Sequence, residues 1–232
     1  MKIKIVIISD THNKHRQIQS QDLPIADIII HCGDFTSMGY NHEIKDFMRW
    51  YSGLNQYDYK IVVAGNHDKL FEDFPVLAKE QIPDNVIYLE DSGVEILGKY
   101  FYGSPVQKIF YNWAFNRSEE KMKEHWQAIP DHTDVLITHS PPHKIRDFAT
   151  YSNENAGSPS LYDEVVNRIK PQISLMGHIH EGYGITIHKN ITFINACSLN
   201  RKYEYVNKPI LIELDDNVVN ILSYNENNVD VI

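Results

Sequence analysis

Short apolar runs that end in clusters of aspartate, asparagine, histidine and glycine are the feature that most constrains how this chain folds. Five such runs occur: Lys2–Ile8, Ile25–His31, Lys60–Ala64, Val135–Thr138 and Gln172–Met176. The polar clusters that follow them are, in order, Asp10-Thr11-His12, Gly33-Asp34, Gly65-Asn66-His67-Asp68, His139, and Gly177-His178-Ile179-His180. Short β-branched runs bounded in this way are typical of buried strands. The sequence therefore predicts strands whose ends gather polar side chains.

Segments with helical spacing alternate with these strands. The predicted helices are His42–Leu54, Leu70–Gln81, Ser118–Ile129 and Leu161–Ile169, and the predicted hairpins are Val94–Tyr102, Gly184–Asn195 and Pro209–Tyr224. Strands that first alternate with helices and later pair with one another predict a mixed α/β sandwich. We expect one domain over residues 1–232, with a polar tail that frays from Asn225 onward.

The composition argues against several classes of partner. A formal net charge of −9 does not suit a broad electrostatic grip on a nucleic-acid polymer or an anionic membrane. Met1–Ile8 is too short and too interrupted by lysine for a secretory signal, and no apolar run is long enough to cross a bilayer. Cys32 and Cys197 form no CxxC motif and are predicted to be reduced. We therefore expect a cytoplasmic protein with no membrane partner.

The polar clusters carry residue types that bind metal ions. Taken singly, a strand-end aspartate is more often a turn residue, and a lone histidine is more often structural. Five clusters at successive strand ends favour one shared site, because open α/β sheets form their sites there. Mixed carboxylate, amide and imidazole ligands suit Mn²⁺, Fe or Zn²⁺ better than Ca²⁺. Asp10 and His12 are two residues apart, as are His178 and His180, so on extended strand ends each pair would point the same way.

The ordered set Asp-x-His, Gly-Asp, Gly-Asn-His-Asp, strand-end His and Gly-His-x-His resembles the calcineurin-like metallophosphoesterase superfamily. Within it, the chain is more similar to the metallophosphoesterase-domain-containing proteins of the mammalian fetal-brain type and their bacterial relatives. The segments that carry this closer resemblance are His31–Thr36, Thr138–Pro142, Gly177–Gly184, Asn195–Ser198 and Asn207–Pro209. The resemblance runs from Ile5 to about Leu214.

The resemblance implies a four-layer α-β-β-α sandwich with two mixed sheets and a pair of divalent metal ions. Asp10, His12, Asp34 and His180 would hold one ion, and Asp34, Asn66, His139 and His178 the other, so that Asp34 bridges them. Mn²⁺ is the first choice, with Fe or Zn²⁺ as alternatives. A hydroxide bridging the metals would be the nucleophile, and two such ions would explain how an acidic protein binds a phosphate ester. His67 is the natural general acid for the leaving alkoxide.

Several residues near the predicted site have open roles. Related phosphatases often orient the catalytic histidine with a carboxylate just after Gly-Asp, but Phe35–Gly39 contains no acid, and Asp68 is expected to point away. Ser140 stands where this branch would have glycine. Asn13, His143, Arg146 and Arg117 are candidates for substrate contact, although solvated loop residues are the simpler interpretation. The loop Pro141–Ser160, with Tyr151, Asn153 and Asn155, is expected to form a pocket wall.

The favoured function is hydrolysis of small or cyclic-nucleotide phosphodiesters. One alternative is a phosphomonoesterase, acting on protein or small-molecule substrates at the same site. Another is a non-catalytic interaction protein that retains the fold, but such proteins lose ligand residues and none is lost here. A DNA nuclease usually needs added domains and a basic track, which this chain lacks. The expected partner is thus a small phosphate ester, and the sequence carries no prediction of oligomeric state.

Overall fold

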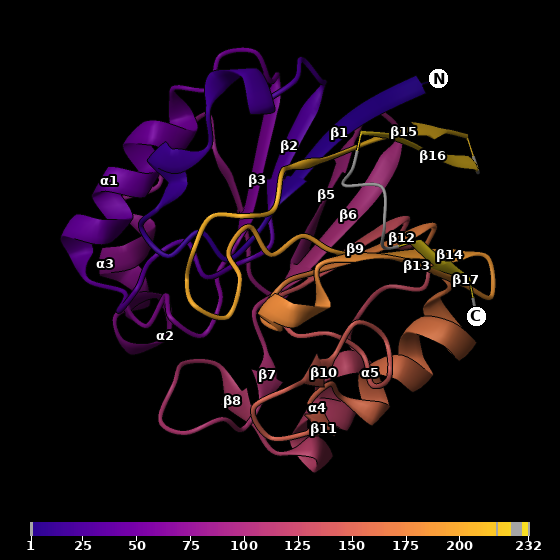
Figure 1. Ribbon diagram of the computed structural model, residues 1–232. Coiled ribbons are helices and arrows are strands. Elements are labelled where there is room, and N and C mark those ends of the chain that lie inside the picture. Colours follow the sequence, from indigo (N-terminus) through magenta and orange to yellow (C-terminus); the bar gives the residue numbers. More distant parts are fainter. Residues whose placement is uncertain (1, 217, 224–228, 232) are drawn as a thin grey trace.

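Two mixed sheets packed face to face form the centre of the computed structural model, which describes residues 2–216, 218–223 and 229–231 (Figure 1). In these residues the first sheet has six strands, in the order β16 (Val218–Ser223), β15 (Ile210–Asp215), β1 (Lys2–Ile8), β2 (Ile28–His31), β3 (Tyr59–Val63) and β4 (Ile87–Leu89). The neighbours β1, β2, β3 and β4 run parallel, whereas β15 is antiparallel to both β1 and β16.

The second sheet has seven strands among the described residues. Their order is β17 (Val229–Val231), β13 (Gly184–His188), β14 (Ile191–Asn195), β12 (Ile173–Met176), β9 (Val135–Thr138), β6 (Lys99–Ser104) and β5 (Ser92–Ile96). Its centre is parallel, because β14, β12, β9 and β6 all run in one direction. Two small ribbons lie outside the sheets: β7 (Gln107–Lys108) with β8 (Asn116–Arg117), and β10 (Phe148–Ala149) with β11 (Glu154–Asn155).

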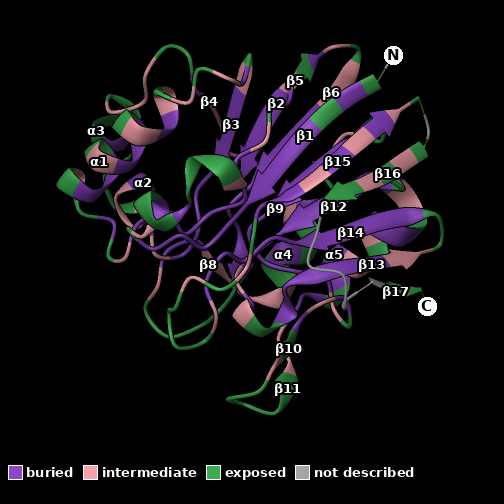
Figure 2. Ribbon diagram, turned by 45° about the horizontal axis from the view of Figure 1, so that its top comes forward, coloured by how far each residue is buried: buried purple, intermediate pink, exposed green. Residues whose placement is uncertain are grey.

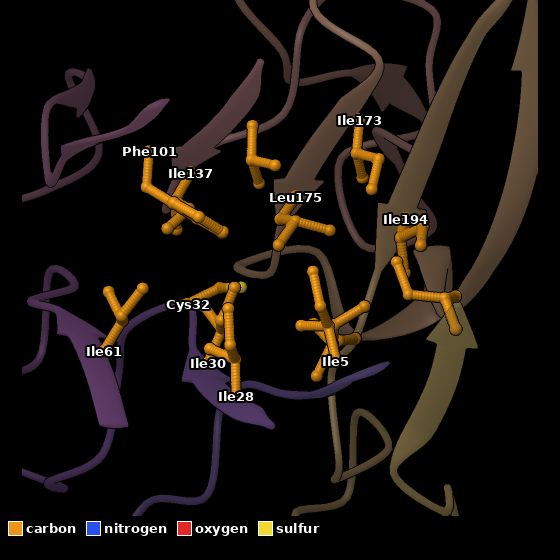
Figure 3. Packing of buried hydrophobic residues seen from close by; sticks show 14 of the residues in the cluster. Ile5, Ile28, Ile30, Cys32, Ile61, Phe101, Ile137, Ile173, Leu175 and Ile194 are labelled. Atoms are coloured by element: carbon orange, nitrogen blue, oxygen red, sulfur yellow. The ribbon is translucent and has the colours of Figure 1, made fainter. Parts of the chain in front are cut away.

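The core between the sheets explains why these apolar runs become strands. Buried side chains of the first sheet, among them Ile5, Ile30 and Ile61, face Phe101 and Leu175 of the second sheet (Figure 3). The strands are buried along most of their length, whereas the helices alternate buried and exposed residues (Figure 2). β-branched residues suit strands that are covered on both faces, so the isoleucine-rich runs lie at the centre of the sandwich.

Helices cover the outer face of each sheet. On the first sheet lie α1 (Asn41–Ser52), α2 (Leu70–Asp73) and α3 (Pro75–Lys79), and on the second α4 (Glu119–Trp126), α5 (Pro159–Asp163) and the π-helical segment η3 (Glu164–Ile169). The predicted four-layer α-β-β-α sandwich is therefore confirmed. Tyr51 and Trp126 are buried in these outer cores, as expected of core residues, and the Tyr51 hydroxyl donates to the carbonyls of Ile29 and Ile61.

Four predicted elements differ from the structure. The strand expected from Ile25 begins only at Ile28, and Ile25 is 81% exposed. The single helix expected over Leu70–Gln81 is two short helices, because Phe74, which precedes Pro75, leaves the helical region (φ −142°, ψ 66°). Leu161–Ile169 divides into α5 and η3. Of the tail expected to fray, residues 225–228 and 232 lie outside the described residues, whereas Val229–Val231 pair with β13.

Three short 3₁₀ helices also occur in the described part of the chain: η1 (His15–Gln17), η2 (Ser20–Asp22) and η4 (His180–Gly182). They belong to the loops that follow β1 and β12. Backbone hydrogen bonds join the loops at the strand ends to one another, from the Asp10 amide to the Gly33 carbonyl and from the Gly177 amide to the His139 carbonyl. The two sheets therefore bring their polar clusters to one common edge.

Candidate metal centre

All of the predicted ligand residues and His67 meet at this edge. In the described residues, three groups of side chains have converging ligand atoms: Asp10, His12 and His180; His12, Asp34 and His67; and Asp34, His139 and His178. Asp34 belongs to two of the groups, with Oδ2 3.7 Å from His12 Nε2 and 3.4 Å from His139 Nε2. Asn66 completes the set, since its Oδ1 lies 3.0 Å from His139 Nε2. The structure thus places Asp34 between the two halves of the site.

Backbone carbonyls fix the direction of the histidine nitrogens. The Nδ1 atoms of His12, His139 and His180 lie 3.2, 3.0 and 3.0 Å from the carbonyl oxygens of Thr36, Cys32 and Asn200. A carbonyl only accepts, so each Nδ1 carries a proton, and each ring, once its Nε2 is deprotonated, directs the Nε2 lone pair inward. His12 Nε2 and His180 Nε2 are only 3.2 Å apart. Two lone pairs that face each other in this way suit a cation between them.

The backbone at the ligands is unusual. Asp10, His12, Asp34 and His178 all have positive φ, between 38° and 65°. This left-handed region is costly for residues with a side chain, and such outliers cluster at functional sites. The geometry also corrects one expectation. The residue pairs two apart do not lie on extended strands, and His178 and His180 fall in different groups of converging atoms. Asp10 and His12, by contrast, do converge in one group.

Three glycines allow loops to pass close to the ligands. A Cβ on Gly177 would lie 2.1 Å from Asp10 Oδ2, and one on Gly65 would lie 2.3 Å from Asp34 Oδ1. A Cβ on Gly33 would lie 2.4 Å from His139 Nδ1. No side chain can be accommodated at such distances without moving the ligand. The glycines of the Gly-Asp, Gly-Asn-His-Asp and Gly-His-x-His clusters are therefore packing requirements of the site.

Asp10 accepts most of its hydrogen bonds through Oδ2, although the His178 amide is shared with Oδ1, at 3.1 Å. Oδ2 accepts from the Ser9 hydroxyl at 2.6 Å, the Cys197 thiol at 3.1 Å and the His178 amide at 3.0 Å. Oδ1 lies 3.4 Å from His180 Nε2 and 3.9 Å from His12 Nε2. The carboxylate is therefore oriented by its outer oxygen and presents the inner one to the centre, as second-shell partners of metal ligands do. Neither Ser9 nor Cys197 stood out in the sequence.

The protonation states suit a cation site. Burial lowers the pKa of His12 to about 4 and that of His178 to about 3, so both rings are neutral ligands at pH 7. Burial alone would raise the pKa of Asp34, but the charges of His139 and His67 hold it well below its usual range. His139 has a pKa raised to about 9, because Asp34 outweighs the effect of burial. A bound cation would replace that proton as the neutralising charge for Asp34.

His67 lies beside Asp34 but is oriented by other groups. Its Nε2 is 4.0 Å from Asp34 Oδ2, and its Nδ1 is 2.6 Å from the Ser37 carbonyl. Its ring stacks on Trp113, with 3.9 Å between centroids. Asp68 points away, as expected: it accepts hydrogen bonds from the amides of Gly65, Asp34 and Thr36 and from the Thr36 hydroxyl. Sequence reasoning missed Trp113, although the run Phe110-Tyr111-Asn112-Trp113 is unusually aromatic.

A pocket of about 480 Å³ opens onto Asp34, Asn66, His67, His178 and His180. Its walls come from three loops, which contribute Ile109, Phe110 and Tyr111; Tyr151, Ser152 and Glu154; and Arg201 and Tyr203. Tyr151 confirms the wall expected from Pro141–Ser160, whereas Asn153 and Asn155 do not line this pocket. Ser140 is buried and also lies outside the lining.

The other candidates for substrate contact are engaged elsewhere. Arg117 pairs with Glu72 at 2.9 Å, and Arg146 with Thr186 at 2.8 Å and with Asp230 at 2.8 Å. The Asn13 amide donates to Ser37 and Glu43. His143 Nδ1 lies 3.6 Å from Asp147. None of the four lines the described pocket, so its lining gives no support to substrate contact by them, although Arg117 lies in β8 and is not a loop residue.

Comparison with known proteins shows which family has these clusters in this order. The model of the calcineurin-like phosphoesterase family matches residues 3–182, most of the chain and all of the clusters described above. The chain belongs to the calcineurin-like phosphoesterase family. Members of this family typically bind divalent metals, and the converging donor atoms fit such ions in chemistry and spacing. The resemblance inferred from the motifs is thus confirmed.

Individual relatives agree with the family assignment. Human "Metallophosphoesterase domain-containing protein 1" is 37% identical over 91% of this chain and 71% of its own length. "Probable glycerophosphodiester phosphodiesterase GpdQ" of Arcobacter nitrofigilis is 25% identical over 90% of this chain and 87% of its own. One solved structure superposes with a TM-score of 0.70 at 15% identity, over 97% of this chain and 100% of the other, which supports the fold. No helix in the described part of the chain is long and apolar enough to span a membrane.

Proposed function

We propose that this calcineurin-like phosphoesterase is a dinuclear-metal phosphodiesterase that hydrolyses small or cyclic-nucleotide diesters. The observation that carries the proposal is the inward convergence of the imidazole Nε2 atoms and carboxylate oxygens around Asp34. Asp10, His12, Asp34 and His180 would hold one ion, and Asp34, Asn66, His139 and His178 the other. Mn²⁺ is the favoured metal, because exchangeable sites with oxygen and nitrogen ligands accept it.

The metal ions, when bound, supply Lewis acidity toward phosphoryl oxygens and an activated water. The residues of the chain then have separate tasks. The carbonyl-fixed imidazoles would turn Nε2 toward the ions, and His67 presents Nε2 at the edge of the pocket, where its imidazolium form would give the Nε2 proton to the leaving alkoxide and keep the Nδ1 proton on the Ser37 carbonyl. The close packing of Gly33, Gly65 and Gly177 keeps these groups from shifting during the reaction.

Preference for a diester is supported by the walls of the pocket. A diester presents a second ester arm, which needs space and apolar or stacking surfaces beyond the ions. The pocket offers about 480 Å³ with Phe110, Tyr111, Tyr151 and Tyr203 around it. The relative named as a probable glycerophosphodiester phosphodiesterase points the same way. The alternative, a phosphomonoesterase, would be favoured by charge alone, since a monoester carries the larger negative charge.

A comparison of matched aryl esters tests this proposal. Protein loaded with Mn²⁺ should have a higher kcat/KM on bis(4-nitrophenyl) phosphate than on 4-nitrophenyl phosphate at one pH, metal concentration and ionic strength. At least one 2′,3′- or 3′,5′-cyclic nucleotide should also be hydrolysed. A clear preference for the monoester, with no cyclic nucleotide turned over, would establish the phosphomonoesterase instead.

A further inference from the structure

The imidazole of His67 is stacked on an aromatic residue from a distant loop. The ring centroids of His67 and Trp113 are 3.9 Å apart with an interplanar angle of 28°, and His12 meets the His67 ring edge-on at 4.6 Å. The single hydrogen bond at Nδ1, to the Ser37 carbonyl at 2.6 Å, fixes the tautomer of the ring. One hydrogen bond does not fix the plane of an imidazole. Contacts with Trp113 and His12 supply that second constraint.

Trp113 is tied to the same structural unit as His67. The amide of Ala114 donates to the carbonyl of Asn66 at 3.1 Å, next to His67 in the chain. The amide of Phe115 donates to Glu72 of α2 at 2.6 Å, and both Ala114 and Phe115 are buried. Lys69 Nζ lies 5.9 Å from the Trp113 ring centroid. The backbone that follows Trp113 is therefore attached to the loop and helix that follow β3, on which His67 also lies.

Among the residues that the structure describes, no carboxylate contacts Nδ1 of His67 and could replace the stacking on Trp113. The residues after Gly33-Asp34, Phe35–Gly39, contain no acid. The nearby carboxylate of Asp68 is occupied by backbone amides and the Thr36 hydroxyl. Asp34 Oδ2 is 4.0 Å from His67 Nε2, on the side of the ring that faces the reaction centre. The Ser37 carbonyl and the face of the Trp113 indole therefore orient the His67 ring, a task that a carboxylate often performs in related phosphatases.

We propose that Trp113 is a positioning residue that holds the plane of the His67 imidazole so that Nε2 faces the leaving-group side of the pocket. The inference rests on the proposed role of His67 as general acid. It predicts that Trp113 affects the reaction only where the leaving group needs a proton. Without the indole the His67 imidazole is chemically unchanged but is less often aligned with the leaving group. Small misalignments of reacting groups lower the reaction rate strongly.

Paired esters with good and poor leaving groups test the proposal. Trp113→Ala should lower kcat about 10–100-fold on an alkyl ester, with a smaller loss on a nitrophenyl ester and little change in KM. His67→Ala should lose about 10²–10⁴-fold on the alkyl ester. Trp113→Phe, which keeps an aromatic face, should restore most of the rate. Asn112→Ala, an exposed neighbour outside the pocket lining, is the matched control and should retain the activity of the parent protein.

The double variant separates the possible failures. If Trp113 acts through His67, Trp113→Ala should cause no further loss in the His67→Ala background. Additive losses would show that Trp113 acts independently, and would overturn the inference while leaving His67 as the acid. Equal losses of His67→Ala on both ester types would instead refute the general-acid role in the proposed function.

A measurement without turnover tests the positioning itself. In protein labelled with ¹³C at the histidine Cε1 atoms, His67 is assigned by its absence from the His67→Ala spectrum. Its ring should show restricted motion in the parent protein and in Trp113→Phe, and greater motion in Trp113→Ala. A His67 ring that stays equally restricted without the indole would overturn the inference, whatever the activities are.

Discussion

At the scale of single residues, backbone conformation and close packing shape this site as much as the ligand side chains do. Positive φ angles at Asp10, Asp34 and His178 turn these side chains inward at a cost in backbone energy. The glycines at positions 65 and 177 have no Cβ atom, which at either position would collide with a carboxylate of the site. Such features are stable only if the surrounding hydrogen bonds over-determine them, as the contacts of Asp10 and Asp68 do.

Asp34 should matter most for metal loading, because it lies between both halves of the site. Reloaded parent protein should bind about two ions per chain, and Asp34→Ala should lose both, whereas Asp10→Ala should lose mainly one. Elemental analysis after removal of excess metal measures this. Asp131→Ala, at an exposed residue paired with Arg168, serves as the control. A stoichiometry that stays below one for every metal tried would rule out the dinuclear site.

Among the elements, the small β10–β11 ribbon and the turn between its strands form one wall of the pocket. The Thr150 amide donates to Glu181 at 3.1 Å, and Arg201 donates to the Thr150 hydroxyl at 3.2 Å, so this ribbon is attached to the loops after β12 and β14. The Arg201 guanidinium lies 5.6 Å from the Tyr151 ring. The result is an exposed aromatic surface, backed by a cation, at the mouth of the pocket.

Tyr151 should contribute to binding of the second ester arm. Tyr151 is 72% exposed as a residue and lines the pocket, so its ring is available for stacking. Tyr151→Ala should raise KM for bis(4-nitrophenyl) phosphate about 3–10-fold, the equivalent of one aromatic contact, with little effect on methyl 4-nitrophenyl phosphate. Tyr151→Phe retains the ring and should behave as the parent. Steady-state kinetics with both esters decide the matter, and an equal rise in KM for the two would mean that the ribbon holds phosphate instead of the arm.

Elements with a strong pattern could be predicted from the sequence, and weakly patterned ones could not. The β-branched runs and the Ser118 cap of α4 were recognisable because each has a local physical signature. The break at Phe74, the π-helical turn of η3 and the β10–β11 ribbon depend on packing and have no such signature. The same holds for the site. Its candidate ligands follow strands in a fixed order, whereas Trp113, Arg201 and Tyr203 reach it from loops that no periodicity places.

At the scale of the whole molecule, several histidines are buried, among them His12, His15, His31 and His139. His15 is one that the proposed chemistry does not use. It lies in η1 against Phe47 and Trp50 of α1, with ring centroids 5.6 and 5.0 Å away, and its Nε2 is 3.3 Å from Asp46 Oδ2. Burial lowers the pKa of His15 to about 4, although Asp46 opposes the shift. This residue therefore links folding to pH independently of the ligands.

The sign of that linkage follows from the two protonation states. In the unfolded chain His15 titrates near its ordinary pKa of about 6.5. Between about pH 6.5 and pH 4 the unfolded chain binds a proton that the folded protein does not, so the free energy of unfolding falls as the pH falls through this window. His15→Phe keeps a ring against α1 but cannot be protonated. From pH 7 to pH 4 the stability of the parent relative to this variant should therefore decline, by at most about 3 kcal/mol.

Urea unfolding of both proteins at intervals across this range measures the difference. The parent and His15→Phe share every proposed metal ligand, so loss of metal at acid pH affects both equally and cancels in the comparison. The free energy of unfolding of the parent minus that of His15→Phe should fall as the solution is acidified, because only the parent loses the contribution of a buried neutral imidazole. A difference that stays constant from pH 7 to pH 4 would mean that the contact with Asp46 offsets the burial of His15, so that its pKa is the same in the folded and unfolded states.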